Sequence, residues 1–114
     1  MKTIILGAAG FIGTNLAIEL LKRKDSEIIL ADRKLAYFAK TFNSDYPEAI
    51  LMESPLDITM DFDIIKGCDV VYHLVSSNMP TTSNQCVSQD LELNVLFSAK
   101  LFESCVKNGV KKVV

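Results

Sequence analysis

Three glycines near the start of the chain are the residues whose type and spacing most directly suggest chemistry. Gly7, Gly10 and Gly13 form the pattern Gly-x-x-Gly-x-x-Gly, which follows a short apolar run and precedes a stretch with helical periodicity. Glycines at such a turn let the backbone approach a dinucleotide pyrophosphate, and the amides that begin the helix can donate to its oxygens. The pattern predicts a dinucleotide-binding turn, and the alternative is a tight strand-to-helix turn without a ligand.

An acidic residue stands where such a site requires one. Asp32 ends the second apolar run, about 20 residues beyond the last glycine of the pattern. Its carboxylate can accept hydrogen bonds from the adenosine ribose and would repel the 2′-phosphate of NADP. We therefore expect NAD, while the adjacent Arg33 leaves NADP as the less favoured alternative. The pattern is followed by Thr14 instead of Lys-Ser/Thr, so the phosphate loop of nucleoside triphosphatases is not indicated.

The elements that must position these residues alternate between two kinds. Apolar runs of strand length occupy residues 2–6, 27–31, 49–52, 69–74 and 110–114. Helical periodicity or a helical turn is expected at residues 11–24, 34–45, 63–66 and 85–107. This alternation predicts an α/β fold with a doubly wound parallel sheet, the NAD(P)-binding Rossmann fold, in a single domain over residues 1–114.

The long helix expected over residues 85–107 has two apolar stripes. At 100° per residue, one stripe contains Leu93, Phe97 and Leu101, and the other contains Val87, Leu91, Val95, Phe102 and Cys105. One stripe should cover the sheet. The other needs a second partner, either a further part of the protein or a second subunit, so a homodimer through this helix is one expectation.

Composition excludes several other functions. A formal net charge of -2 provides no general attraction for nucleic acid or for anionic membranes. Glycines interrupt the apolar N-terminus, so we expect neither a signal peptide nor a membrane span. Cys68, Cys86 and Cys105 lack the spacing of a metal site or disulfide framework, which favours buried thiols, no bound metal and a cytoplasmic location.

Four segments in order resemble the extended short-chain dehydrogenase/reductase superfamily, specifically its NAD-dependent epimerase/dehydratases. They are residues 7–13 with Phe11-Ile12, the acidic Asp32, the triplet Leu56-Asp57-Ile58, and residues 69–77. The stretch from residue 73 to residue 95 is most similar to UDP-glucose 4-epimerase-like members.

This resemblance implies a set of cofactor-binding residues. They are Gly7, Ala9, Gly10, Phe11, Ile12, Gly13, Asp32, Arg33, Asp57, Ile58, Leu74, Val75 and Ser76. Asn94 corresponds to a helix residue that helps to shape the floor of the active site, with an ordinary solvent-facing asparagine as the alternative. His73, inside a buried strand, is interpreted as a hydrogen-bonded core residue and not as a ligand or base.

The resemblance also implies a reaction. Family members remove a hydride transiently from a sugar carbon of a nucleotide sugar, using a tyrosine base and a lysine four positions later. None of the three tyrosines has such a lysine: the fourth residues after Tyr37, Tyr46 and Tyr72 are Thr41, Ile50 and Ser76. We therefore expect an N-terminal, cofactor-binding part of a longer enzyme, cut after its fifth strand and inactive alone. The alternatives are a non-catalytic dinucleotide sensor and an NAD(P)-dependent reductase of the same superfamily.

Overall fold

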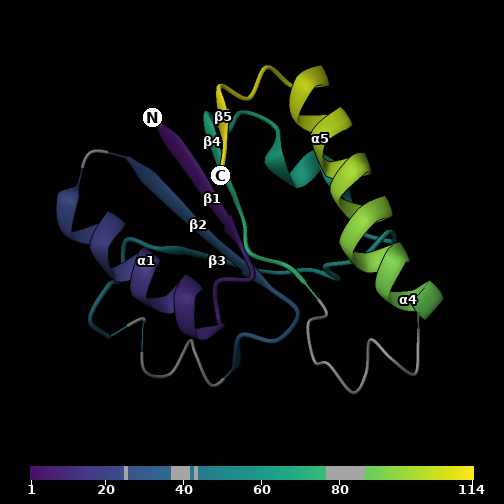
Figure 1. Ribbon diagram of the computed structural model, residues 1–114. Coiled ribbons are helices and arrows are strands. Elements are labelled where there is room, and N and C mark those ends of the chain that lie inside the picture. The colour runs from purple at the N-terminus through teal and green to yellow at the C-terminus, as the bar shows by residue number, and fades with distance from the viewer. Residues whose placement is uncertain (25, 37–41, 43, 77–86) are drawn as a thin grey trace.

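The computed structural model describes residues 1–24, 26–36, 42, 44–76 and 87–114. Five strands form one parallel sheet in the order β3-β2-β1-β4-β5 (Figure 1). The strands are β1 Lys2–Leu6, β2 Glu27–Asp32, β3 Ile50–Glu53, β4 Val70–His73 and β5 Lys112–Val113. The expected doubly wound parallel sheet is confirmed, with strand boundaries that differ by a few residues at most.

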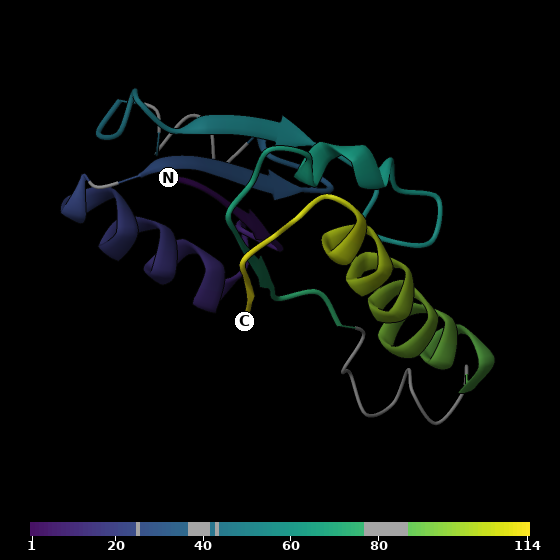
Figure 2. The same ribbon diagram turned by 90° about the horizontal axis from the view of Figure 1, so that it is seen from above.

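Helices lie on both faces of this sheet. Helix α1 (Phe11–Arg23) follows β1, and the short 3₁₀ turn η1 (Phe62–Ile65) precedes β4. The helix between β4 and β5 is continuous (Figure 2) and consists of α4 (Val87–Leu91), the π-helical turn η2 (Glu92–Leu96) and α5 (Phe97–Lys107). In Figure 1, α1 and the α4–α5 helix lie on different sides of the strands.

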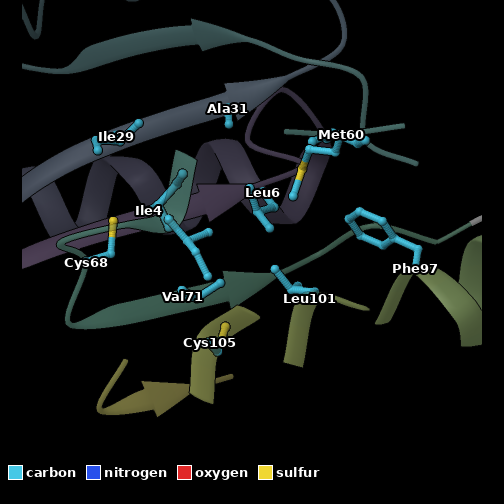
Figure 3. Packing of buried hydrophobic residues seen from close by; sticks show 12 residues of the cluster. Ile4, Leu6, Ile29, Ala31, Met60, Cys68, Val71, Phe97, Leu101 and Cys105 are labelled. Carbon is cyan, nitrogen blue, oxygen red and sulfur yellow. The ribbon is translucent and has the colours of Figure 1, made fainter. Parts of the chain in front are cut away.

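Alternation along β1 explains this two-layer cover. Ile5 belongs to the buried cluster that includes Ala17 and Leu21 of α1, whereas Ile4 and Leu6 belong to the cluster that includes α5. Successive side chains of a strand point to opposite faces, so a strand buried on both faces is apolar throughout. The second cluster is shown in Figure 3, where the α5 residues Phe97, Leu101 and Cys105 face the sheet.

The parallel register brings the carboxyl ends of the strands to one edge. Leu6 at the end of β1 pairs with Ala31 of β2 on one side and with His73 of β4 on the other. Strand order reverses at β1, since β2 and β3 lie on one side of it and β4 and β5 on the other. In open α/β sheets, ligands bind outside the carboxyl ends of the strands at such a switch point.

The grouping of Cys105 with Val87, Leu91, Val95 and Phe102 in one stripe of the long helix is wrong. Cys105 is 3% exposed and packs in the same cluster as Phe97 and Leu101, with which it forms a continuous row at intervals of four residues. Regular helical geometry is the physical reason, because Phe97, Leu101 and Cys105 all lie in α5 and residues four apart in an α-helix share a face. The other members of that stripe, Val87, Leu91, Val95 and Phe102, are exposed, so this stripe is the one that does not cover the sheet.

Some expectations fall partly or wholly outside the described residues. The helix expected at 34–45 includes residues 37–41 and 43, and Cys86 and residues 77–84 also lie outside. The other two cysteines, Cys68 and Cys105, are buried free thiols, and burial raises their pKa values. Within the described ranges, no helix is both long and apolar enough to cross a membrane, and no cluster of three metal-ligating side chains occurs.

Candidate functional site

Two of the three glycines in the turn are required by its packing, and the third is not. Gly7 has φ of 91°, and a Cβ there would lie 2.8 Å from the carbonyl oxygen of Leu74. A Cβ at Gly13 would lie 2.4 Å from the carbonyl oxygen of Gly7. Both positions therefore exclude a side chain through close packing of the turn, as expected for the first and last glycines of this pattern.

Gly10 differs from the other two. A Cβ at this position would meet the carbonyl oxygen of Gly7 at 3.5 Å, an ordinary contact, and its φ of -75° is open to any residue. Gly10 lines a cavity at the carboxyl edge of the sheet. The packing of the described residues does not require a glycine at this position.

The N-terminus of α1 opens at the same place. Gly10 is its N-cap residue, no side-chain hydrogen bond caps this end, and the first turn contains no acidic residue. Lys22 and Arg23 stand in the last turn, where they compensate the negative end of the helix dipole. The positive end is left without a compensating carboxylate in its own turn, which suits an anionic ligand.

Asp32, at the end of β2, is tied to the glycine turn through its carboxylate. Oδ2 accepts a hydrogen bond from the amide of Ala9 at 2.9 Å, and Oδ1 accepts one from the amide of Arg33 at 2.7 Å. The Ala9 contact crosses from the second strand to the first turn. Asp32 therefore fixes the turn as well as presenting a carboxylate to the cavity that it lines.

Asp57 provides a second carboxylate beside the cavity. The hydroxyl and the amide of Thr59 both donate to its Oδ1. These two hydrogen bonds hold the pKa of Asp57 below its ordinary value; desolvation opposes them, and the positive charge of Arg33 adds a lesser lowering effect. Asp57 is therefore an anion at neutral pH, with its orientation set by Thr59.

The cavity has a volume of about 520 Å³, within the usual range for cofactor sites. It brings together most of the cofactor-binding residues predicted from the resemblance: Gly7, Gly10, Asp32, Arg33, Asp57, Ile58, Leu74, Val75 and Ser76. The predicted residues Ala9, Phe11, Ile12 and Gly13 are not among its lining. Phe11 and Ile12 are 87% and 67% exposed, Gly13 is buried beneath the turn, and the Ala9 amide is engaged by Asp32.

Sequence reasoning missed part of the lining. Leu56 and Thr59 flank the predicted Asp57 and Ile58, while Gln89, Glu92 and Leu93 come from the helix after β4. These three have the i, i+3, i+4 spacing of one helical face, which is the signal that could have identified them. Asn94 does not line the cavity, and its side-chain amide donates to Asp90 at 2.8 Å within the helix.

His73 lies beneath the turn that follows β4. Its Nε2 is 2.7 Å from the hydroxyl oxygen of Ser98, and its ring packs edge-on against Phe97 and Phe102, with centroids 5.5 and 6.1 Å away. Burial lowers the pKa of this histidine below its ordinary value. These contacts agree with the interpretation of His73 as a hydrogen-bonded core residue.

Comparison with known proteins extends these observations. A sequence model of the NAD dependent epimerase/dehydratase family matches residues 3–114. A dTDP-D-glucose 4,6-dehydratase of Dictyostelium discoideum is 31% identical over 122 aligned positions, which cover 99% of this chain and 28% of that protein.

Solved structures give the same result for the fold. The UDP-N-acetylglucosamine 4-epimerase of Methanobrevibacter ruminantium is 24% identical, with a TM-score of 0.82 over 98% of this chain and 36% of its own. MoeE5, solved with UDP-glucuronic acid and NAD, is 27% identical, with a TM-score of 0.80 over 99% of this chain and 35% of its own. The chain therefore spans about a third of the length of the proteins that it resembles.

Proposed function

Because this chain belongs to the NAD dependent epimerase/dehydratase family, we propose that it is the cofactor-binding part of an enzyme that acts on a nucleotide sugar with NAD. The cavity at the carboxyl edge of the sheet is the proposed cofactor site. NAD would supply the hydride acceptor there, and the residues described above would bind and orient it. The named relatives act on or bind dTDP- and UDP-linked sugars, which supports a substrate of the same class.

The observation that carries this proposal is the open position at Gly10. Neither its backbone angle nor its neighbours demand a glycine, yet it adjoins the uncapped start of α1 in the cavity lining. A pyrophosphate would gain both close backbone approach and the positive end of the helix there. Glycine is also favoured at a helix N-cap, so the support for a ligand comes from the position of Gly10 in the cavity lining beside the uncapped helix start.

The remaining lining residues are proposed to hold the other parts of the dinucleotide. Asp32 would accept hydrogen bonds from the adenosine ribose, and its charge would oppose the 2′-phosphate of NADP. Asp57 and Ile58 would lie against the adenine, as the family resemblance implies. Leu74, Val75 and Ser76 follow the strand on the far side of the switch point and would line the nicotinamide half.

Calorimetric titration of the purified protein with NAD and NADP tests the site. We expect NAD to bind more tightly, and Asp32→Asn to weaken NAD by about tenfold or more, since a hydrogen bond to a charged group contributes about 1.5–3 kcal/mol. Asp61→Asn is the matched control, because Asp61 also accepts a backbone hydrogen bond, from Asp63, but does not line the cavity. No binding of either dinucleotide, or equal losses in the two variants, would contradict the proposal.

A further inference from the structure

A chain of hydrogen bonds joins the end of β4 to the π-helical turn η2. The hydroxyl of Ser98 donates to the carbonyl oxygen of Asn94 at 2.8 Å. A hydroxyl carries a single proton, so Ser98 can meet the Nε2 of His73, 2.7 Å away, only as an acceptor. His73 must therefore carry its proton on Nε2.

The other ring nitrogen leads to the same assignment independently. The amide of Val75 donates to Nδ1 of His73 over a long 3.4 Å. This contact requires an unprotonated Nδ1, because an amide and an N–H group of the ring would both be donors. The two contacts together select the neutral Nε2–H tautomer, and the lowered pKa of the half-buried ring is consistent with it.

These contacts reach two parts of the cavity lining. The amide of Leu74 still donates to Leu6 of the sheet at 3.0 Å, but the next amide, that of Val75, donates to the His73 ring. Val75 lines the cavity, and so do Glu92 and Leu93 of η2. The ring itself packs against Phe97 and Phe102.

We propose that His73 is a positioning residue of the cofactor site, which as the Nε2–H tautomer sets the Val75 amide relative to the π-helical turn through Ser98. It touches no cofactor itself and acts through the backbone of Val75. This inference rests on the proposed function only in naming the ligand whose binding it affects. It also gives the π turn a role, since η2 supplies the carbonyl oxygen that orients the Ser98 hydroxyl.

Two substitutions test the contacts of the two ring nitrogens separately. His73→Asn keeps an acceptor near the position of Nδ1 but cannot reach Ser98, whereas His73→Gln keeps a donor near Nε2 and leaves the Val75 amide without its acceptor. We expect His73→Gln to weaken NAD binding about threefold, the effect of one lost neutral hydrogen bond, and His73→Asn to weaken it less. Equal effects, or the opposite order, in variants with native thermal unfolding would overturn the proposal.

The tautomer is measured without any cofactor. Nitrogen-15 spectra of histidine-labelled protein, with the His73 signals identified by their loss in His73→Gln, should show a protonated Nε2 and an unprotonated Nδ1 near pH 7.5. Ser98→Ala should allow exchange between tautomers, whereas Ser88→Ala, on the exposed surface of α4, should not. An Nδ1–H tautomer, or rapid exchange in the unchanged protein, would overturn the role of His73. Failure of the unchanged protein to bind NAD would instead overturn the proposed function.

Discussion

Single residues of the glycine turn have separable roles in this protein. Gly7 and Gly13 are required by contacts within the turn, whereas those contacts do not require a glycine at position 10. In the same way, the Asp32 carboxylate both anchors Ala9 and faces the cavity, so its loss should disturb the turn as well as the ligand. These differences make the site open to test by substitution of one residue at a time.

Substitution of Gly10 by alanine should affect binding more than folding. The backbone angle accepts alanine and the nearest contact is ordinary, so we expect the free energy of unfolding to change by less than about 1 kcal/mol. The added methyl group would occupy the proposed pyrophosphate position and weaken NAD binding. Gly13→Ala is the contrast, because its Cβ would overlap backbone atoms and should destabilise the protein by at least about 2 kcal/mol. Urea unfolding and calorimetry measure both, and an unfolded Gly10→Ala protein would refute the distinction.

The titration of His73 should appear as a dependence of stability on pH. Its pKa is lowered by burial from an ordinary value of 6.5, so the unfolded chain binds more protons than the folded one between the two values. Stability should therefore be full above about pH 6.5 and decline as the pH falls toward the lowered pKa. The groups described around the ring, Phe97, Phe102, Ser98 and the Val75 amide, carry no charge that would oppose this.

Urea midpoints between pH 8 and pH 5 measure this effect against a His73→Gln control. The unchanged protein should lose stability over that range by more than the variant does. Asp57 and Asp69 also have lowered pKa values, but they lose their contribution below their ordinary value of 3.8 and so lie outside this window. Parallel pH profiles for the two proteins would show that burial of His73 has no energetic consequence.

At the scale of the element, the helix after β4 is divided by its π turn. The α5 half presents Phe97, Leu101 and Cys105 to the sheet, and the η2 half presents Glu92 and Leu93 to the cavity. Leu93, Phe97, Leu101 and Cys105 recur every four residues, so they follow one face of the helix from the cavity to the core. The element therefore joins core packing to the wall of the site.

Substitutions on the two sides of α5 should have unequal effects. Leu101 is fully buried, so Leu101→Ala should lower the free energy of unfolding by about 2–5 kcal/mol through lost contacts and a residual cavity. Val106 is 84% exposed on the same helix, and Val106→Ala should change stability by no more than about 0.5 kcal/mol. Chemical unfolding of both variants provides the measurement. Similar losses would mean that the helix is rotated relative to this description.

At the scale of the whole molecule, the outer face of the same helix suggests association with a second copy. Val87, Leu91, Val95 and Phe102 are exposed along it. A pair of copies related by a twofold axis would bury this apolar row against the same row of the second copy.

Sedimentation of the protein and of a Val95→Glu variant tests this association. We expect a dimer for the unchanged protein and a monomer for the variant, because the new carboxylate would be buried against an apolar surface. Lys22→Glu, an exposed change of charge on α1, should leave the dimer intact. A monomer at all concentrations would contradict the prediction and assign this face to another part of the protein.

The distribution of functional groups also makes a prediction about activity. None of the tyrosines in this chain has a lysine four positions later, so these residues supply no tyrosine–lysine pair for proton transfer. We expect the 114-residue chain alone to convert no UDP- or dTDP-sugar. Chromatography of such sugars after incubation with the chain and NAD provides the measurement. Measurable turnover would refute the prediction that the chain alone is inactive.

Features that depend on neighbours along the chain can be predicted from the sequence. The glycine turn, the carboxylate at the end of β2 and the alternation of strands with helices are local patterns, and they predict the parallel sheet and a dinucleotide-binding turn. The other residues of the cavity lining that were predicted came from the family resemblance. Tertiary structure decided the features that depend on contacts across the fold: the Ala9–Asp32 bond, the Glu92 and Leu93 wall, the inward position of Cys105, and the link from His73 to Ser98. The physical reason is that these contacts depend on strand register and helix phase.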